Sequence, residues 1–146
     1  MSNFDLIPYT PTTSSFEILY PNNFHIEEDD SGIVTITSPL SYSSLTLSGY
    51  NANSNIDEKV LTEFFQNITE DYTSVSELTK KITKERLYLE CAFEKDNINW
   101  VWWAVAEVNQ IIMISANSET VLTRDDYYLY CYIIDEMKIY PSIFED

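Results

Sequence analysis

Apolar and polar residues alternate with a period of two over short stretches in the first third of the chain, which is typical of half-buried β-strands. The alternation covers Phe16–Tyr20, Phe24–Glu27, Ile33–Thr37 and Leu45–Ser48. Turn-forming residues separate these stretches, beginning with Pro21-Asn22-Asn23 between the first two. The pattern predicts a β-meander whose first two strands are joined by a short turn.

A helical spacing of apolar residues follows the meander. Val60, Leu61, Phe64, Phe65 and Ile68 recur at the intervals that place side chains on one face of a helix. Asn55 precedes this run, and Glu58 stands three residues later, as in a capping box. We therefore expect an α-helix over about Ile56–Glu70 with Asn55 as its N-cap.

Strand patterns return in the middle of the chain. They cover Thr79–Thr83, Arg86–Glu94, Trp100–Glu107 and Gln110–Ala116. Asp96-Asn97 and Val108-Asn109 stand where hairpin turns belong. Both faces of Trp100–Glu107 are apolar, so this strand should be central and covered on both sides.

A second helix is predicted near the end of the chain. Thr123 is its candidate N-cap, and Asp125 and Asp126 follow in the first turn, where the helix dipole favours negative charge. Its apolar side carries Tyr130, Ile133, Ile134 and Met137. Pro141 limits the helix at its C-terminal end.

The succession of strands, helix, strands and helix, with hairpin-length connections, predicts an α+β fold in which two helices flank an antiparallel β-sheet. A length of 146 residues suits one hydrophobic core. Thr10–Ser15 resembles a linker and precedes the first strand pattern. We therefore expect an N-terminal extension over residues 1–15 and a single α+β domain over 16–146.

The run FEILYPNNFHI at residues 16–26 resembles the F-x-I-x-Y-P-x-G-W-x-V start of the PsbP-like and Mog-like superfamily. Asn23 replaces the usual Gly and Phe24 the usual Trp; Asn tolerates positive φ, and Phe can fill the aromatic position. The resemblance implies an αβα sandwich over roughly residues 16–140. It also implies a non-enzymatic binder, since the superfamily includes photosystem subunits, a partner of a nuclear transport GTPase and Eag-type chaperones of secreted toxins.

Charge restricts the possible partners. The chain has 24 acidic and 8 basic residues, a formal net charge of -16 and a pI near 4.1. Such a molecule repels nucleic acid and anionic membranes and attracts basic proteins. We expect a basic protein partner, no nucleic acid and no membrane as ligands, and a monomer or homodimer.

The sequence begins without a leader pattern and has no apolar stretch of membrane-spanning length, so a cytoplasmic location is expected. Cys91 and Cys131 are 40 residues apart and lack the CxxC spacing of redox and zinc sites. Two reduced, buried thiols are the simplest interpretation.

The densest group of carboxylates is Glu27-Glu28-Asp29-Asp30. It is either a solvated hairpin turn or a contact surface for a basic partner. A Ca²⁺ site is disfavoured, because the spacing does not fit an EF-hand loop and contiguous acids point in different directions. No metal and no cofactor are expected.

Aromatic residues supply the other candidates for partner binding. Trp100, Trp102 and Trp103 lie in one strand and suit a core, but Trp100 is next to a turn and is the best candidate for partial exposure. The second helix combines acids with tyrosines, and its candidate contact residues are Asp125, Asp126, Tyr128 and Tyr132. Its tyrosines can instead pack on the sheet while the acids face water.

Nothing in the sequence indicates catalysis. His25 is the only histidine, and no GxxxxGK, GxSxG or HExxH string occurs. Four of the eight bases, Lys80, Lys81, Lys84 and Arg86, fall within seven residues. These bases either offset nearby acids or form a small positive spot. Because the sequence contains none of these catalytic motifs, we expect no enzyme.

The leading functional hypothesis is a bacterial immunity protein, an acidic binding domain that neutralises a cognate toxin, plausibly a basic nuclease-like one. The alternative is an Eag-type chaperone or adaptor, which would bind a secreted effector through an exposed apolar groove. A third class, an enzyme or small-ligand protein, would require a cavity of about 300 Å³ or more with convergent polar groups.

Overall fold

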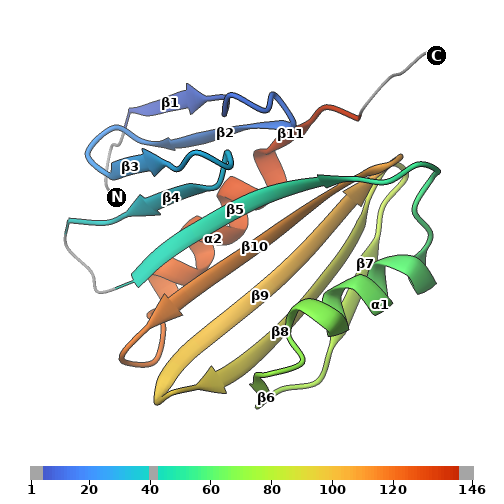
Figure 1. Ribbon diagram of the computed structural model, residues 1–146. Coiled ribbons are helices and arrows are strands. Elements are labelled where there is room, and N and C mark those ends of the chain that lie inside the picture. The colour runs from blue at the N-terminus through green and yellow to red at the C-terminus, as the bar shows by residue number, and fades with distance from the viewer. Residues whose placement is uncertain (1–4, 40–42, 142–146) are drawn as a thin grey trace.

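The computed structural model describes residues 5–39 and 43–141 of the chain (Figure 1). These residues form two helices and eleven strands. In chain order the elements are β1 (Leu6–Tyr9), β2 (Phe16–Pro21), β3 (His25–Glu28), β4 (Val34–Thr37), β5 (Ser43–Asn51), α1 (Glu58–Ile68), β6 (Thr73–Ser74), β7 (Thr79–Ile82), β8 (Leu87–Lys95), β9 (Ile98–Glu107), β10 (Gln110–Ser118), α2 (Arg124–Glu136) and β11 (Lys138–Ile139).

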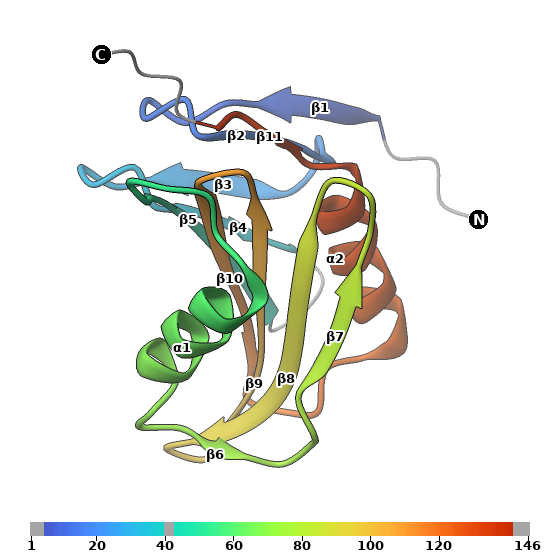
Figure 2. The same cartoon turned by 90° about the vertical axis from the view of Figure 1, so that its right-hand side faces the viewer.

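An eight-stranded antiparallel sheet is the centre of the fold. Its strands follow the order β3-β4-β5-β10-β9-β8-β6, and β7 also pairs with β8. Helix α1 lies on one face of this sheet and α2 on the other, as Figures 1 and 2 show. The predicted α+β fold, with an antiparallel sheet between two helices, is confirmed.

Strand β9 lies between β10 and β8 and is covered on both faces, as predicted. Trp103 and Val105 join the buried cluster on the α2 side. Ala104 and Ala106 join a separate cluster on the α1 side. The sheet therefore separates two hydrophobic cores, and the core beneath α2 is the larger one.

A second, three-stranded sheet has the order β1-β2-β11. The predicted pairing of the first two strand patterns is wrong, because β2 pairs with β1 and β11 while β3 pairs with β4. The Pro21–Phe24 turn, closed by a 3.0 Å bond from Phe24 N to Pro21 O, carries the chain from one sheet to the other. Period-two alternation identifies a strand but not its partner.

The three-stranded sheet also includes residues that precede Phe16. Strand β1 lies within the segment predicted as an N-terminal extension, and its pairing with β2 attaches Leu6–Tyr9 to the fold. Residues 1–4 and 142–146, at the ends of the two predicted segments, lie outside the described residues. Phe16 and Ile18 of β2 are fully buried in the same cluster as Ile133 of α2.

The two helices begin at different kinds of cap. Thr123 caps α2 as predicted, its side chain accepting a 3.1 Å bond from Asp126 N. Helix α1 starts two residues later than expected, because Asp57 and not Asn55 is the N-cap and accepts a 2.9 Å bond from Val60 N. The chain leaves α2 after Glu136 and forms β11 before it reaches Pro141.

Both cysteines are free thiols. Cys91 is buried in the α1-side cluster, and Cys131 is half-buried against the α2-side cluster. The sheet therefore lies between the two sulfur atoms.

Candidate functional site: two cavities beside helix α2

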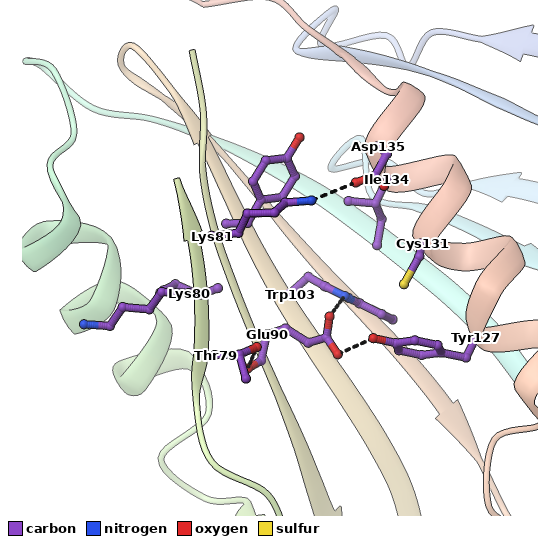
Figure 3. A pocket seen from close by; sticks show the side chains of 11 residues that line it. Thr79, Lys80, Lys81, Glu90, Trp103, Tyr127, Cys131, Ile134 and Asp135 are labelled. Atoms are coloured by element: carbon purple, nitrogen blue, oxygen red, sulfur yellow. Dashed lines mark hydrogen bonds and ion pairs between the residues drawn. The ribbon is translucent and has the colours of Figure 1, made fainter. Parts of the chain in front are cut away.

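Two neighbouring cavities lie beside α2, and Tyr127 lines both of them. The first, about 270 Å³, lies between α2 and strands β7 and β8 (Figure 3). The second, about 320 Å³, lies where the loop before α2 meets the ends of β8, β9 and β10. We call the first the polar cavity, because charged side chains line it, and the second the apolar cavity, because its lining is mostly apolar.

Glu90 of β8 organises the polar cavity. Its Oε1 accepts a 2.9 Å bond from Trp103 Nε1, and its Oε2 accepts a 2.6 Å bond from Tyr127 Oη (Figure 3). Glu90 and Trp103 face each other in the β8–β9 register, so the sheet itself fixes two of these three groups. The carboxylate is thus bound by two neutral donors, and the Tyr127 ring is held in one position between the cavities.

Burial favours the neutral forms of two side chains in this cavity, Tyr127 and Cys131. Desolvation, with the hydrogen bond to Glu90 adding to it, raises the pKa of the Tyr127 phenol far above its usual value. Desolvation also raises the pKa of the Cys131 thiol. At neutral pH the Tyr127 hydroxyl donates to Glu90, and the fraction of reactive Cys131 thiolate is small.

The basic residues near the polar cavity are used in ion pairs. Lys81 Nζ lies 3.6 Å from Asp135 Oδ1 and 4.4 Å from the centre of the Tyr88 ring. Lys80 points away from the cavity in Figure 3 and pairs with Glu58. Arg86 Nε donates a 2.8 Å bond to Glu107 Oε1. Three of the four clustered bases therefore offset neighbouring acids, one of the two predicted alternatives.

The predicted contact residues on α2 divide into two groups. Asp125, Tyr128 and Tyr132 are exposed, with 61 % of Tyr128 and 47 % of Tyr132 accessible to solvent. Asp126 is half-buried, and its Oδ2 accepts a 3.0 Å bond from Ser43 Oγ. Asp126 thus attaches the helix to β5, while the other three are available to a partner.

The acidic turn, Glu27-Glu28-Asp29-Asp30, also forms hydrogen bonds that support local structure. Glu28 accepts bonds from the Tyr9 hydroxyl and from Thr12, at 3.0 Å from the backbone N and 2.6 Å from Oγ1. Asp29 Oδ1 accepts from Ser31 N at 2.8 Å and from Ile33 N at 3.0 Å. Glu28 and Asp29 thus hold local structure, while Glu27 and Asp30 are exposed, and a role of all four residues in partner contact stays a prediction.

Trp100 is half-buried and lines the apolar cavity. Its ring stacks on that of Trp102 at 6.3 Å and meets Tyr72 edge-on at 5.2 Å. The Trp100 ring packs with the cluster on the α1 side of the sheet, and Trp100 also lines the cavity together with Val121, Leu122 and Tyr127. The acidic turn does not line this cavity.

Sequence reasoning missed the residues that complete the apolar cavity. Val75 and Val121 are 61 % and 79 % exposed and stand in irregular segments far apart in the chain. Leu122, Val101 and Ala116 complete the apolar lining. Two adjacent aliphatic residues in a polar loop, Val121 and Leu122, were the signal available in the sequence.

Within residues 5–39 and 43–141, no group of three or more His, Cys, Asp or Glu side chains is arranged to hold a metal ion. Neither α1 nor α2 has the length and apolar character needed to cross a lipid bilayer.

No protein-family model and no curated protein sequence matches the chain significantly. Solved structures do resemble it. Cyanobacterial PsbP (CyanoP) from Synechocystis superposes with a TM-score of 0.69 at 11% identity, covering 95% of both chains. The Ran-binding protein Mog1p of Saccharomyces cerevisiae gives 0.63 at 9% identity, over 95% of this chain and 97% of its own.

A Bacteroides thetaiotaomicron protein gives a TM-score of 0.62 at 12% identity. The match includes 95% of this chain but only 50% of the Bacteroides protein, so this chain spans about half of that protein's length. At these identities the likeness concerns architecture, so the chain has the PsbP-like/Mog-like fold that the sequence resemblance implies.

Proposed function

We propose that this chain is a non-catalytic protein-binding domain whose partner is a basic protein. One observation supports the proposal above all: most of the described Asp and Glu side chains are exposed. Within residues 5–39 and 43–141, only Glu27, Glu58, Glu107 and Asp135 take part in ion pairs. The remaining charge gives the surface a negative field that attracts cations and accelerates encounter by roughly 10- to 10³-fold.

The outer face of α2 is the contact surface that fits this partner best. Tyr128 and Tyr132 are one helical turn apart and expose large amphipathic rings, while Asp125 lies on the turn before them. Tyrosine gives a large contact area at low entropic cost. In the neighbouring polar cavity, partial burial raises the pKa of Tyr127 and of Cys131, which supports binding over nucleophilic chemistry there.

The fold neighbours supply an analogy for this proposal. Mog1p is described as a Ran-binding protein, so this architecture can present a surface to a protein partner. The analogy concerns the scaffold and not particular residues, because 9% identity transfers no contact.

In its specific form, the proposal is that the domain is a bacterial immunity protein that neutralises a toxin encoded beside it. Co-expression tests this directly. Cells producing the toxin should survive with the wild-type domain, and survival should fall when Asp125, Tyr128 and Tyr132 are replaced by Asn, Ala and Ala. A matched variant with Glu63, Gln66 and Asn67 of α1 replaced by Gln, Ala and Ala should still protect. Equal killing with and without the wild-type domain would refute the immunity role.

A second candidate, an Eag-type chaperone that binds an apolar effector segment, is favoured by the apolar cavity and by exposed Val75, Ile82 and Val121. Salt separates the two candidates. Capture of the basic toxin should weaken as ionic strength rises, because the Debye length falls from about 30 Å at 0.01 M to about 8 Å at 0.15 M. Capture of an apolar effector segment should persist.

A further inference from the structure

We propose that the apolar cavity is the anchor site of the binding surface: it accepts one large apolar side chain from a partner segment that carries Lys or Arg on both sides of that side chain. The inference rests on the proposed function and specifies the chemistry of its partner. It identifies the end of the sheet beside the start of α2 as the place where the partner is fixed.

The size and lining of the cavity fit an apolar side chain. Its volume of about 320 Å³ exceeds the roughly 150 Å³ in which an engineered apolar cavity holds benzene. Val101, Ala92 and Ala116 are neighbours in the β8–β9–β10 register and lie on the α2 face of the sheet. Val75 and Val121, the two most exposed lining residues, offer aliphatic surface that a partner would cover.

Polar groups of the lining are few. Asn99 and Asn117 contribute amides, and the hydroxyl of Tyr127 is already bonded to Glu90. Trp100 adds one indole N–H, which is buried and has no hydrogen-bond partner among the described residues, so two amides and one N–H face a lining that is otherwise mostly apolar. A burial site for a hydrocarbon or aromatic group is the better fit, as at the centre of protein interfaces.

The charges next to the cavity are mainly negative. Glu94 is paired with the lining residue Asn99 in the β8–β9 register, and Glu119 stands between the lining residues Asn117 and Val121 in the chain. Asp96 and Asp125 follow in the adjacent hairpin and helix turn, and all four acids are exposed. Arg124 and Lys95 are the bases in these segments, and Lys95 lies over the Tyr72 ring at 4.7 Å.

An apolar cavity with acidic neighbours complements an apolar side chain with basic neighbours. The cavity is also held in shape before any partner arrives, since the Glu90 carboxylate and the stacked Trp103 ring, at 6.3 Å, hold the Tyr127 wall. Pre-organisation of this kind lowers the entropic cost of binding.

Defined peptides test the inference on the full chain. The probes are acetyl-KKLKK-amide, acetyl-KKSKK-amide and acetyl-EELEE-amide, titrated at low salt and followed by amide chemical shifts. We expect the KKLKK peptide to bind at least tenfold more tightly than KKSKK, and EELEE not to bind. The largest shifts should fall on Val75, Val101, Val121 and Leu122.

Two matched pairs of variants locate the effect. Val75→Ser with Val121→Ser should remove the preference for KKLKK over KKSKK, whereas Val60→Ser on α1 should preserve it. Glu94→Gln with Glu119→Gln should weaken both basic peptides severalfold more than Glu63→Gln with Glu70→Gln. Folding of each variant is checked by its amide spectrum before titration.

The outcomes separate this inference from the function on which it rests. Equal binding of KKLKK and KKSKK, or shifts centred elsewhere, overturns the anchor site and leaves the acidic binding domain standing. Failure of both basic peptides to bind at low salt overturns the anchor site and counts against the electrostatic basis of the proposed function as well.

Discussion

Val108, in the turn between β9 and β10, has φ of 56°, which is unfavourable for a β-branched residue. The left-handed region costs such a residue roughly 1–2 kcal/mol, whereas Asn enters it more easily. Because 52 % of the side chain is exposed, replacing it loses little buried area. Val108→Asn should therefore raise the free energy of unfolding by about 1 kcal/mol, measured by urea denaturation. Val121→Asn, in a loop without positive φ, should give no gain, and equal gains would contradict the explanation.

The charge of Glu28 supports local structure, because its carboxylate accepts hydrogen bonds from Tyr9 and Thr12. Hydrogen bonds from the Thr12 side chain, then from Tyr9 and the Thr12 backbone, lower the pKa of its carboxyl group. A lowered pKa in the folded state gives stability that is present above the usual carboxyl range and is lost as pH falls through the folded pKa.

Glu28→Gln should therefore lower the urea midpoint at pH 7, and its difference from wild type should shrink as the pH drops below the ordinary pKa of Glu. Asp30→Asn, in the same turn but exposed, serves as the control. A difference that stays constant with pH would show that the carboxylate charge is not responsible.

At the scale of elements, the caps decide where a helix begins. The side chain of Asp57 accepts the hydrogen bond at the start of α1, so Asp57→Ala should cost about 1 kcal/mol of stability. Asn55→Ala, which removes the cap predicted from sequence, should change the free energy of unfolding by less than half as much. Chemical denaturation of both variants under one set of conditions compares them, and the reverse order would contradict the observed cap.

The helices and strands differ in how well the sequence predicts them. Periodicity located α2 and the long strands β8 to β10, because each supplies enough alternating or helical positions to define a face. It missed β6 and β11, which have two residues each and no period to detect. Asn55 and Asp57 are equally good capping residues in sequence, so only the fold could distinguish them.

The candidate site was predictable to a similar degree. Exposure of Tyr128 and Tyr132 followed from the helical spacing of α2, and partial burial of Trp100 followed from its position near a turn. The hydrogen bonds of Glu28 could not be predicted from the sequence, because its partners Tyr9 and Thr12 lie in the segment expected to be an N-terminal extension. The apolar cavity joins Val75 with Val121, and no local pattern connects residues 46 positions apart.

For the whole molecule, net charge sets the response to salt. At -16 the folded chain repels itself, and screening should relieve that repulsion. Raising NaCl from about 0.01 M to about 0.15 M should therefore raise Tm in calorimetry while it weakens binding to a basic partner. A variant with Asp30, Glu63, Glu77 and Glu85 converted to amides should show a smaller rise. A Tm that falls with salt would contradict the prediction.

The separation of the interior by the sheet has a consequence for motion. Helix α1 contributes only Leu61 and Phe65 as buried side chains to the smaller core, whereas α2 is enclosed between the large sheet and β2. Sub-global opening should therefore release the α1 layer first and leave the opposite layer intact. In native-state hydrogen exchange, amides of α1 should exchange through a lower-energy opening than those of α2 and β9. The proposed contact surface on the outer face of α2 therefore belongs to the slowly exchanging part of the molecule.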